Sequence, residues 1–490
     1  MSMPADPVDL FFQQASRFPD HPAIVVDGQT VTYAQLADKV RNMAAALAAV
    51  ADHPRVLIHL PQCPDAYAAM LAALMAGGYY APTNTQAPAE RQHIIRDRFR
   101  PDVVLTRADV AASLGEVGAP VLDVDALPES RLETARPPHD LAYVMFTSGS
   151  TGIPKGVMVP REGLAHYVAW IAADIAPGPQ DRWSQHPNIA FDLSVLDIYG
   201  ALCFGSALYP LTTQRDRLMP ADFIRRNALT IWDSVPSVID QMRNARQVTP
   251  DKFASLRLLT FCGEPLLPEH LDAIFQAAPD VMVHNTYGPT EATVSCTLIR
   301  LTADDYRSAC GGASVALGDP VPGMSISLEG GGSPDDGEIC IHGPQVARGY
   351  WMDESETAQR FHPADGARKT MYRTGDWATR KDGQLYFQAR VDRQIKLHGH
   401  RIELGDIDAA LRSLGFILAH TVKMDDRLIA AVESDGAVDQ DKIALELRTL
   451  LPEYCCPSHI VAFPNLPRNV NDKIDTKRVQ EMIRQCLPIR

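Results

Sequence analysis

The sequence has no pair of cysteines at Cys-x-x-Cys spacing and no cluster of cysteine and histidine at the spacing of zinc ligands. Its nine cysteines are scattered along 490 residues. These absences argue against a zinc site and against a disulfide framework. Reduced thiols, as in a cytoplasmic protein, are the simplest expectation.

Long apolar runs, a basic leader and an excess of positive charge are also missing. The start of the chain has no basic region followed by an apolar core, so no signal peptide is expected. The apolar tract at residues 43–51 is too short to span a bilayer. The formal net charge of −14 argues against a general affinity for nucleic acid or anionic membranes. We therefore expect a cytoplasmic protein without membrane insertion, in which local positive groups hold any anionic ligand.

The composition, with 46% hydrophobic and 22% charged residues, is that of a globular protein. The length exceeds one ordinary core, so at least two domains are expected. Residues 23–32 form a hairpin pattern with Asp27-Gly28 at the turn, and Thr32 is placed to cap a helix with apolar residues every three or four positions. Strand and helix patterns then alternate as far as residue 283. This alternation predicts an α/β fold of parallel sheets covered by helices.

Two later regions have a different pattern of expected strands, turns and helices. From about residue 319 to 388, short strand patterns and glycine turns predict a small β-rich subdomain. After Arg390, a helix is expected at 407–414, strands at 421–424 and 428–432, and a last helix near the end. The expected organisation is a large domain at 1–391 and a small α+β domain at 392–490.

The most informative stretch runs from Thr147 to Gly156, between two apolar runs. Its glycines allow backbone N–H groups to turn toward an anion, its hydroxyls can donate hydrogen bonds, and Lys155 supplies a compact positive charge. The spacing is not that of the Walker motif, so a P-loop fold is not implied. The pattern favours a phosphate-binding loop over a flexible surface hairpin.

A second stretch, residues 285–291, follows a predicted strand, where ligands of open α/β sheets usually bind. It offers an amide, an aromatic ring, hydroxyls and a carboxylate within seven residues. From the residues alone it is equally a tight turn or a ligand site. Asp376, in Tyr-Arg-Thr-Gly-Asp, and Lys473, in Asn-Asp-Lys-Ile-Asp, are on their own ordinary turn residues.

Taken together and in this order, the motifs resemble those of the adenylate-forming superfamily. The resemblance spans nearly the whole chain. Within the superfamily the sequence is most similar to amino-acid-activating adenylation domains, among them D-alanine–carrier protein ligases and free-standing adenylation domains of nonribosomal peptide synthesis. The chain has Ala389 and Asp472 at two positions where a glycine is usual in the family.

The resemblance implies a role for each motif. ATP is expected to contact Thr147, Ser148, Gly149, Ser150, Thr151, Lys155, Gly263, Glu264, Pro265, Asn285, Thr286, Tyr287, Gly288, Pro289, Thr290, Asp376, Arg390 and Lys473. Tyr287 would pack on adenine, Thr290 would bond the α-phosphate, and Glu291 would bind Mg²⁺. Asp376 would bind the ribose hydroxyls and Arg390 the ribose and phosphate. Lys473 would bridge the substrate carboxylate and the α-phosphate, which makes it catalytic together with Thr290 and Glu291.

The C-terminal domain is implied to be a mobile lid. Asp392 would be its hinge, and the segment from Lys396 to Gly405 would enter the site for the second half-reaction.

The acyl pocket is implied to be closed by Lys473 and lined by Asp192, Leu193, Leu196, Asp233, Thr260, Cys262, Thr286, Val294 and Ser295. A carboxylate in an apolar stretch is costly unless it is paired, so Asp192 would take the substrate's α-ammonium group, with a helix N-cap as the alternative. Cys262 and Thr286 resemble a pocket for a small side chain. Asp233 departs from the pattern. If it points inward, it favours a second polar or cationic group on the substrate. If it is solvated or bonded to Ser234, alanine or glycine is expected.

The expected reaction is ATP-dependent formation of an aminoacyl-adenylate from a small amino acid, followed by transfer to a phosphopantetheine thiol. Seventeen residues follow Lys473, too few for a carrier domain, so the thiol is expected on a separate carrier protein. An acyl-CoA synthetase for a small carboxylic acid is the alternative. A non-enzymatic adenylate-binding protein is disfavoured because Lys155, Glu291 and Lys473 are all present.

Overall fold

The computed structural model describes residues 4–147, 154–311, 314–363, 370–390, 394–434, 436, 438–468 and 474–487. The chain divides into two compact units. The first comprises Met1–Thr85, Arg98–Phe146 and Gly156–Val391, and the second Gln86–Asp97, Thr147–Lys155 and Asp392–Arg490. Asp392 itself lies outside the described residues, so a hinge and a domain boundary there stay predictions.

Two sheets of the N-terminal region carry the predicted parallel pairing. In the six-stranded sheet the pairings of β3 with β4 and β5, of β4 with β7 and of β5 with β6 are parallel. Its strands in order are β6 (Val121–Asp123), β5 (Val103–Thr106), β3 (Arg55–His59), β4 (Tyr79–Pro82), β7 (Leu141–Thr147) and β8 (Lys155–Pro160). The nine-stranded sheet has the order β17 (Asp319–Pro320), β14 (Thr297–Leu301), β13 (Met282–Tyr287), β12 (Leu258–Phe261), β11 (Ile231–Ser234), β9 (Arg182–Gln185), β10 (Ala207–Pro210), β1 (Pro22–Val26) and β2 (Gln29–Thr32).

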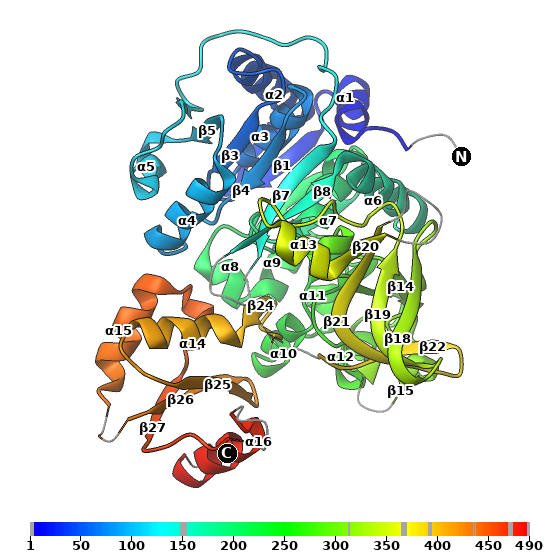
Figure 1. Ribbon diagram of the computed structural model, residues 1–490. Coiled ribbons are helices and arrows are strands. Elements are labelled where there is room, and N and C mark those ends of the chain that lie inside the picture. The colour runs from blue at the N-terminus through cyan, green and yellow to red at the C-terminus, as the bar shows by residue number, and fades with distance from the viewer. Residues whose placement is uncertain are drawn as a thin grey trace. The chain divides into compact units, whose positions relative to one another are not determined.

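Figure 1 shows α3 beside β3 and β4, and α2 packs against α3. Helices alternate with the strands along this part of the chain. They are α1 (Pro7–Arg17), α2 (Tyr33–Ala48), α3 (Pro64–Met75), α4 (Ala89–Phe99), α5 (Ala108–Ala111), α6 (Arg161–Asp174), α7 (Ser194–Leu202), α8 (Gln214–Leu218), α9 (Pro220–Asn227), α10 (Ser237–Asn244), α11 (Pro250–Phe253) and α12 (Pro268–Ala277), with short 3₁₀ turns η1 (Ala112–Leu114), η2 (Thr290–Ala292) and η3 (Tyr306–Ala309). No helix in the described ranges is long and apolar enough to cross a membrane.

Local signals at the start of the chain act as the sequence predicts. Asp27 and Gly28 have φ values of 50° and 77° between the antiparallel strands β1 and β2, as a two-residue hairpin requires. Thr32 caps α2, and it exchanges hydrogen bonds with Gln35 in a capping box.

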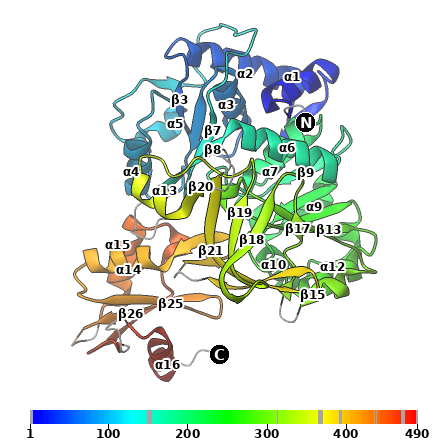
Figure 2. The ribbon, with the colours of Figure 1, turned by 45° about the vertical axis from the view of Figure 1, so that its right-hand side comes forward.

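The predicted β-rich subdomain is a five-stranded sheet, in which Figure 2 shows β18, β19 and β21 side by side. It consists of β18 (Ser325–Ser333), β19 (Asp336–His342), β20 (Phe361–Pro363), β21 (Thr370–Lys381) and β22 (Gln384–Arg390), with α13 (Glu354–Arg360) and the short pair β15 (Cys310–Gly311) and β16 (Ser314–Val315) nearby in sequence.

The C-terminal part of the second unit has the predicted α+β character. Its elements are β23 (Gln394–Leu397), β24 (His400–Glu403), α14 (Leu404–Ser413), β25 (Ala419–Met424), β26 (Arg427–Glu433), α15 (Gln440–Leu450), η4 (Glu453–Cys455), β27 (His459–Phe463) and α16 (Thr476–Cys486). The segment expected as a loop at 396–405 is largely a hairpin of β23 and β24, with His398 and Gly399 in left-handed conformations at its turn.

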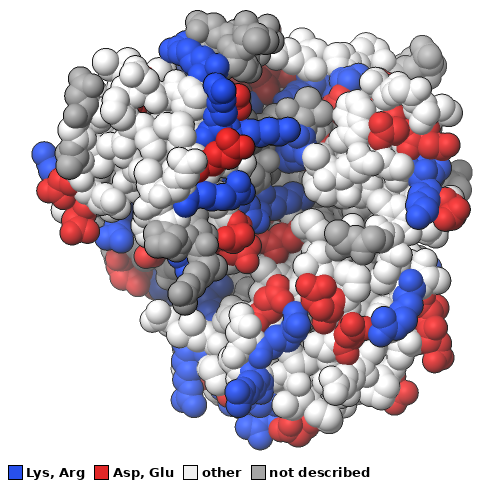
Figure 3. Space-filling view, turned by 90° about the horizontal axis from the view of Figure 1, so that it is seen from below, with Lys and Arg blue, Asp and Glu red and all other residues white. Residues whose placement is uncertain are grey.

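Acidic and basic side chains are interspersed on the face shown in Figure 3. Charges of both signs next to one another weaken a long-range field on this face.

Candidate functional site

The carboxyl ends of β11, β12 and β13 bring many of the predicted residues together. These strands are parallel neighbours, with Asp233 opposite Thr260 and Thr260 opposite His284. Cys262 and Gly263 directly follow β12, and Tyr287 ends β13. Ligands of open α/β sheets usually bind at this edge. The structure therefore assembles a candidate site from segments that lie far apart in the sequence.

Tyr287, Asp376 and Arg390 form a buried chain of hydrogen bonds. The Tyr287 hydroxyl donates to Asp376 Oδ2 at 2.6 Å, and the Arg390 guanidinium pairs with Oδ1 of the same carboxylate. Burial, with the Asp376 carboxylate beside the ring, raises the pKa of Tyr287, so its hydroxyl stays protonated. A carboxylate has about four acceptor positions, and these two bonds leave room for two more donors. Asp376 thus suits the two hydroxyls of a ribose.

The backbone around Asp376 is held by the β-rich subdomain. The Asp376 amide donates to the Thr374 hydroxyl at 2.9 Å, and that hydroxyl donates to the carbonyl of Ile339 at 2.8 Å. The Gly375 amide donates to the buried carboxylate of Glu338 at 2.9 Å. The turn that carries Asp376 is therefore fixed from both sides.

Glu291 lies fully buried in the 3₁₀ turn η2, next to Thr290. The Tyr350 hydroxyl donates to Glu291 Oε1 at 2.8 Å, and the Ala347 amide donates to the Glu291 carbonyl at 2.8 Å. One oriented carboxylate, completed by phosphate and water oxygens, is a common way to hold Mg²⁺. The Glu291 carboxylate fits such an ion, and its role as a Mg²⁺ ligand stays a prediction.

The turn after Glu291 is strained. Thr293 and Val294 are consecutive β-branched residues with φ values of 53° and 69°, a left-handed conformation that such residues rarely adopt. Gln345 pins this turn, because its amide donates to the carbonyl of Ser295 at 2.7 Å and its backbone carbonyl accepts from the Thr293 hydroxyl at 2.7 Å. A Cβ on Gly288 would come within 2.5 Å of the Val294 carbonyl oxygen, so glycine is required there.

Small polar side chains of the predicted pocket bond to one another. The Thr286 hydroxyl donates to the carbonyl of Phe261 at 3.0 Å and lies 3.1 Å from the Ser295 hydroxyl. The Cys262 thiol points to the carbonyl of Val294 at 3.8 Å. Leu196 and Val294 are each 1% exposed. In this part of the wall, the hydroxyls and the thiol contact other protein groups and apolar side chains lie beside them, which fits a short substrate side chain.

Asp192 and Leu193 precede α7. The N-cap position of that helix is Leu193 and has no side-chain cap, so the alternative of Asp192 as an N-cap is wrong. The charge of Asp192 acts on Asp233 and raises its pKa, as expected for two residues of one pocket.

Asp233 is fully buried on β11, and neither carboxylate oxygen has a hydrogen-bond partner among the described residues. The alternative of a solvated Asp233, or one bonded to Ser234, is therefore wrong. The Ser234 hydroxyl accepts from Trp232 Nε1 and donates to the carbonyl of Val235 instead. Burial, reinforced by the charge of Asp192, raises the pKa of Asp233 well above the usual range.

Four residues of this region are not among those predicted from the sequence: Tyr167, Asp197, Gln345 and Tyr350. Asp197 on α7 and Tyr167 on α6 are fully buried near Asp233. Asp197 follows Leu196 directly, and its charge in an apolar helix was a signal that could have found it. Nothing in the sequence around Tyr167 or Gln345 marks them.

Other predicted residues take simpler places. Thr147 ends β7 and Lys155 begins β8, while Ser148, Gly149, Ser150, Thr151, Asp392 and Lys473 lie outside the described residues. Gly263 has a φ of 94°, Glu264 accepts a hydrogen bond from the Ser237 amide at 3.1 Å, and the Asn285 amide donates to the carbonyl of Ala316 at 2.8 Å. Pro265 follows Glu264, and Pro289 separates Gly288 from η2. The roles of all these residues toward a ligand stay predictions.

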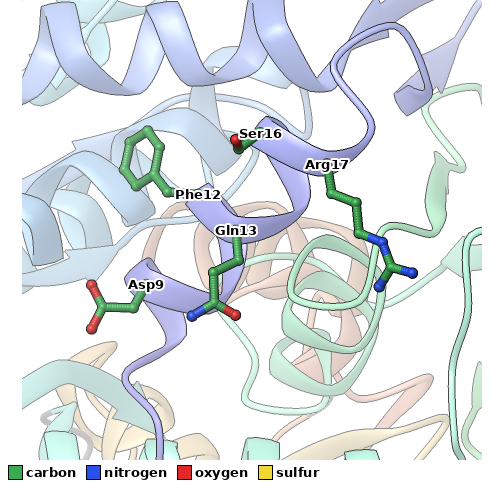
Figure 4. Close-up of a pocket in the computed structure, with 5 residues that line it drawn as sticks. All are labelled: Asp9, Phe12, Gln13, Ser16 and Arg17. Carbon is green, nitrogen blue, oxygen red and sulfur yellow. The ribbon is translucent and has the colours of Figure 1, made fainter.

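A hollow on the surface of α1, shown in Figure 4, contains none of the predicted residues. Its lining comes from one helix: Asp9, Phe12, Gln13, Ser16 and Arg17.

Comparison with known proteins shows the family to which the chain belongs. Residues 11–351 match the model of the AMP-binding enzyme family. The chain is 30% identical to the D-alanine–D-alanyl carrier protein ligase of Staphylococcus epidermidis, over 98% of this chain and 99% of that protein.

Solved structures agree with this similarity. The Vibrio cholerae adenylation domain AlmE, in complex with glycyl-adenosine-5′-phosphate, has a TM-score of 0.85 and 28% identity, with 98% of each chain covered. A nonribosomal peptide synthetase protein containing adenylation and PCP domains has a TM-score of 0.82 and 25% identity, over 98% of this chain and 84% of that one. The chain belongs to the AMP-binding enzyme family, and it is an adenylation domain of the adenylate-forming superfamily.

Proposed function

We propose that this chain activates a small amino acid with ATP in the cytoplasm and transfers the aminoacyl group to the phosphopantetheine thiol of a separate carrier protein. In the first step an oxygen of the amino acid carboxylate attacks the α-phosphorus of ATP, and pyrophosphate leaves. In the second step the thiol attacks the carbonyl carbon, and AMP leaves. The observation that carries the proposal is the similarity to a D-alanine–D-alanyl carrier protein ligase over 98% of this chain and 99% of that protein.

The described residues supply binding and orientation. Asp376, positioned by Tyr287 and Arg390, would hold the ribose. Thr290 would bond the α-phosphate, and Glu291 would hold Mg²⁺, which neutralises charge on the phosphates when bound. These roles fit side chains that are already buried and fixed before a ligand arrives, so little reorganisation is needed during the reaction.

Asp192 is the proposed partner of the substrate's α-ammonium group. Asp192 is half-buried just before α7, and a carboxylate gains charge-assisted hydrogen bonds when it meets a cation with donors of its own. The fatty or aryl acids that acyl-CoA synthetases activate carry no such cation. Asp192 therefore favours an amino acid over the alternative substrate, a simple carboxylic acid.

The proposal is tested by exchange of labelled pyrophosphate into ATP across a panel of amino acids and simple carboxylic acids. Exchange that depends on an amino acid supports it. The second half is tested by transfer of the labelled amino acid to a phosphopantetheinylated carrier protein, with free coenzyme A as the competing acceptor. Exchange with carboxylic acids alone, or product found only on coenzyme A, would favour an acyl-CoA synthetase.

A further inference from the structure

Asp233 and Asp197 are two fully buried acids in the proposed acyl pocket. Asp233 lies on β11 and Asp197 on α7, and both are 0% exposed. None of their four carboxylate oxygens has a hydrogen-bond partner among the described residues. Buried polar atoms in native proteins are nearly always bonded, so four unpartnered oxygens in one place call for an explanation.

The two acids lie within electrostatic reach of each other. Asp233 acts on the titration of Asp197, and Asp192 acts on that of Asp233, so three acids converge on one region. The backbone amide of His186 lowers the pKa of Asp197 and so opposes part of the rise caused by burial. It does not lie in hydrogen-bond geometry with the Asp197 carboxylate. Burial and a neighbouring aspartate are the two largest causes of the raised pKa of each acid. Neither of them supplies a positive charge that would compensate an ionised carboxylate.

Uncharged polar groups complete the surroundings. Thr260 is the register partner of Asp233 on β12, so its side chain projects to the same face of the sheet. Its hydroxyl is buried without a partner among the described residues, as is that of Tyr167, which lies near Asp233, Cys262 and Ser295. The pocket wall therefore presents unused acceptors next to hydroxyls that can reorient.

An apolar substrate would leave this arrangement uncompensated. A methyl group beside two buried carboxyls bonds none of their oxygens, whether they are ionised or protonated. An ammonium group brings three donors and a positive charge, so it can bond several oxygens and allow a carboxylate to ionise.

We propose, on the basis of the function proposed above, that the activated amino acid carries a second ammonium group on a short side chain, which Asp233 and Asp197 hold. The side chain is short because the function proposed above is the activation of a small amino acid. The substrate class is thus a small diamino acid, such as 2,3-diaminopropionate or 2,4-diaminobutyrate, rather than alanine or glycine.

Isosteric pairs of substrates test this with the unmodified chain. Pyrophosphate exchange is compared for 2,3-diaminopropionate against 2-aminobutyrate and for 2,4-diaminobutyrate against norvaline, with alanine, glycine and lysine alongside. We expect a kcat/KM at least about thirtyfold higher for the diamino acid of one pair, the size expected for a buried charge pair. A preference for any uncharged amino acid overturns the inference and leaves the proposed function standing. Exchange with no amino acid overturns both.

Substitutions identify the carboxylates involved. Asp233→Asn and Asp197→Asn should each reduce the preference for the diamino acid over its isostere, while Asp304→Asn, an exposed aspartate, should not. An unchanged preference in both pocket variants also overturns the inference. If either variant does not fold, the isosteric pairs on the unmodified chain still decide.

Discussion

The hydroxyl of Tyr287, at the end of β13, lies 2.6 Å from the carboxylate of Asp376 on β21, 89 residues further along the chain. Tyr287→Phe keeps the aromatic ring and removes only this donor. We expect the KM for ATP to rise about tenfold, because a hydrogen bond to a charged group is lost and Asp376 is less well oriented. The KM for the amino acid should stay unchanged. Exchange kinetics with each substrate varied check this, and an unaltered ATP dependence would show that the hydroxyl is not needed for nucleotide binding.

Lys473→Ala should lower the rate of adenylate formation by about a hundredfold or more, because this lysine is expected to act on charge that develops in the transition state. ATP binding, measured by calorimetry, should be largely retained. Transfer of the aminoacyl group from isolated adenylate to the carrier should survive far better than adenylation. Near-normal exchange in the variant would remove Lys473 from the mechanism.

Asp392→Pro should impair one half-reaction much more than the other. Lys473 and the β23–β24 hairpin belong to the same small domain, and each is expected at the site in a different step, which a hinge would allow. Exchange and carrier loading, measured separately, report the two steps. Equal impairment of both would count against a hinge at Asp392.

Gln345→Ala should lower the free energy of unfolding by about 2–3 kcal/mol, since it removes a buried amide that bonds the carbonyl of Ser295 and leaves that carbonyl unpaired. The KM for the amino acid should rise as well, because Val294 and Ser295 line the proposed pocket. Thermal unfolding and exchange kinetics measure the two effects. Gln359→Ala, at an exposed position on α13, is the matched control. Equal stability of the two variants would show that the strained turn does not depend on Gln345.

The stability of the ligand-free protein should depend on pH through Asp233. Its raised pKa means that the folded state binds a proton more tightly than the unfolded state does. Stability from this group is present below the ordinary carboxyl pKa and is lost as pH rises toward the raised value. Asp233→Asn should therefore raise the melting temperature more at pH 8 than at pH 5. Parallel curves for Asp233→Asn and the control Asp304→Asn would contradict this.

The sequence predicts the parts of this structure whose causes are local. The turn at Asp27-Gly28, the cap at Thr32 and the alternation of strands and helices all depend on residues a few positions apart. The resemblance of ordered motifs identifies Asp376 and Glu291 as site residues, and their roles toward a ligand stay predictions. It could not extend to Tyr350 or Gln345, because their partners Glu291 and Ser295 lie 50 or more residues away and only the folded chain brings them together. The burial of Asp233 likewise depends on how the folded chain packs around β11, all four residues of which are buried.

The left-handed backbone at Thr293 and Val294 also bears on how this pocket could be re-engineered. A new side chain at position 294 must tolerate a φ of 69°, which favours glycine or asparagine and penalises larger residues before any contact with a substrate is counted. Positions 233 and 260 lie on regular strands and carry no such restriction. Attempts to alter substrate choice should therefore begin on β11 and β12, where the backbone leaves the choice of residue open.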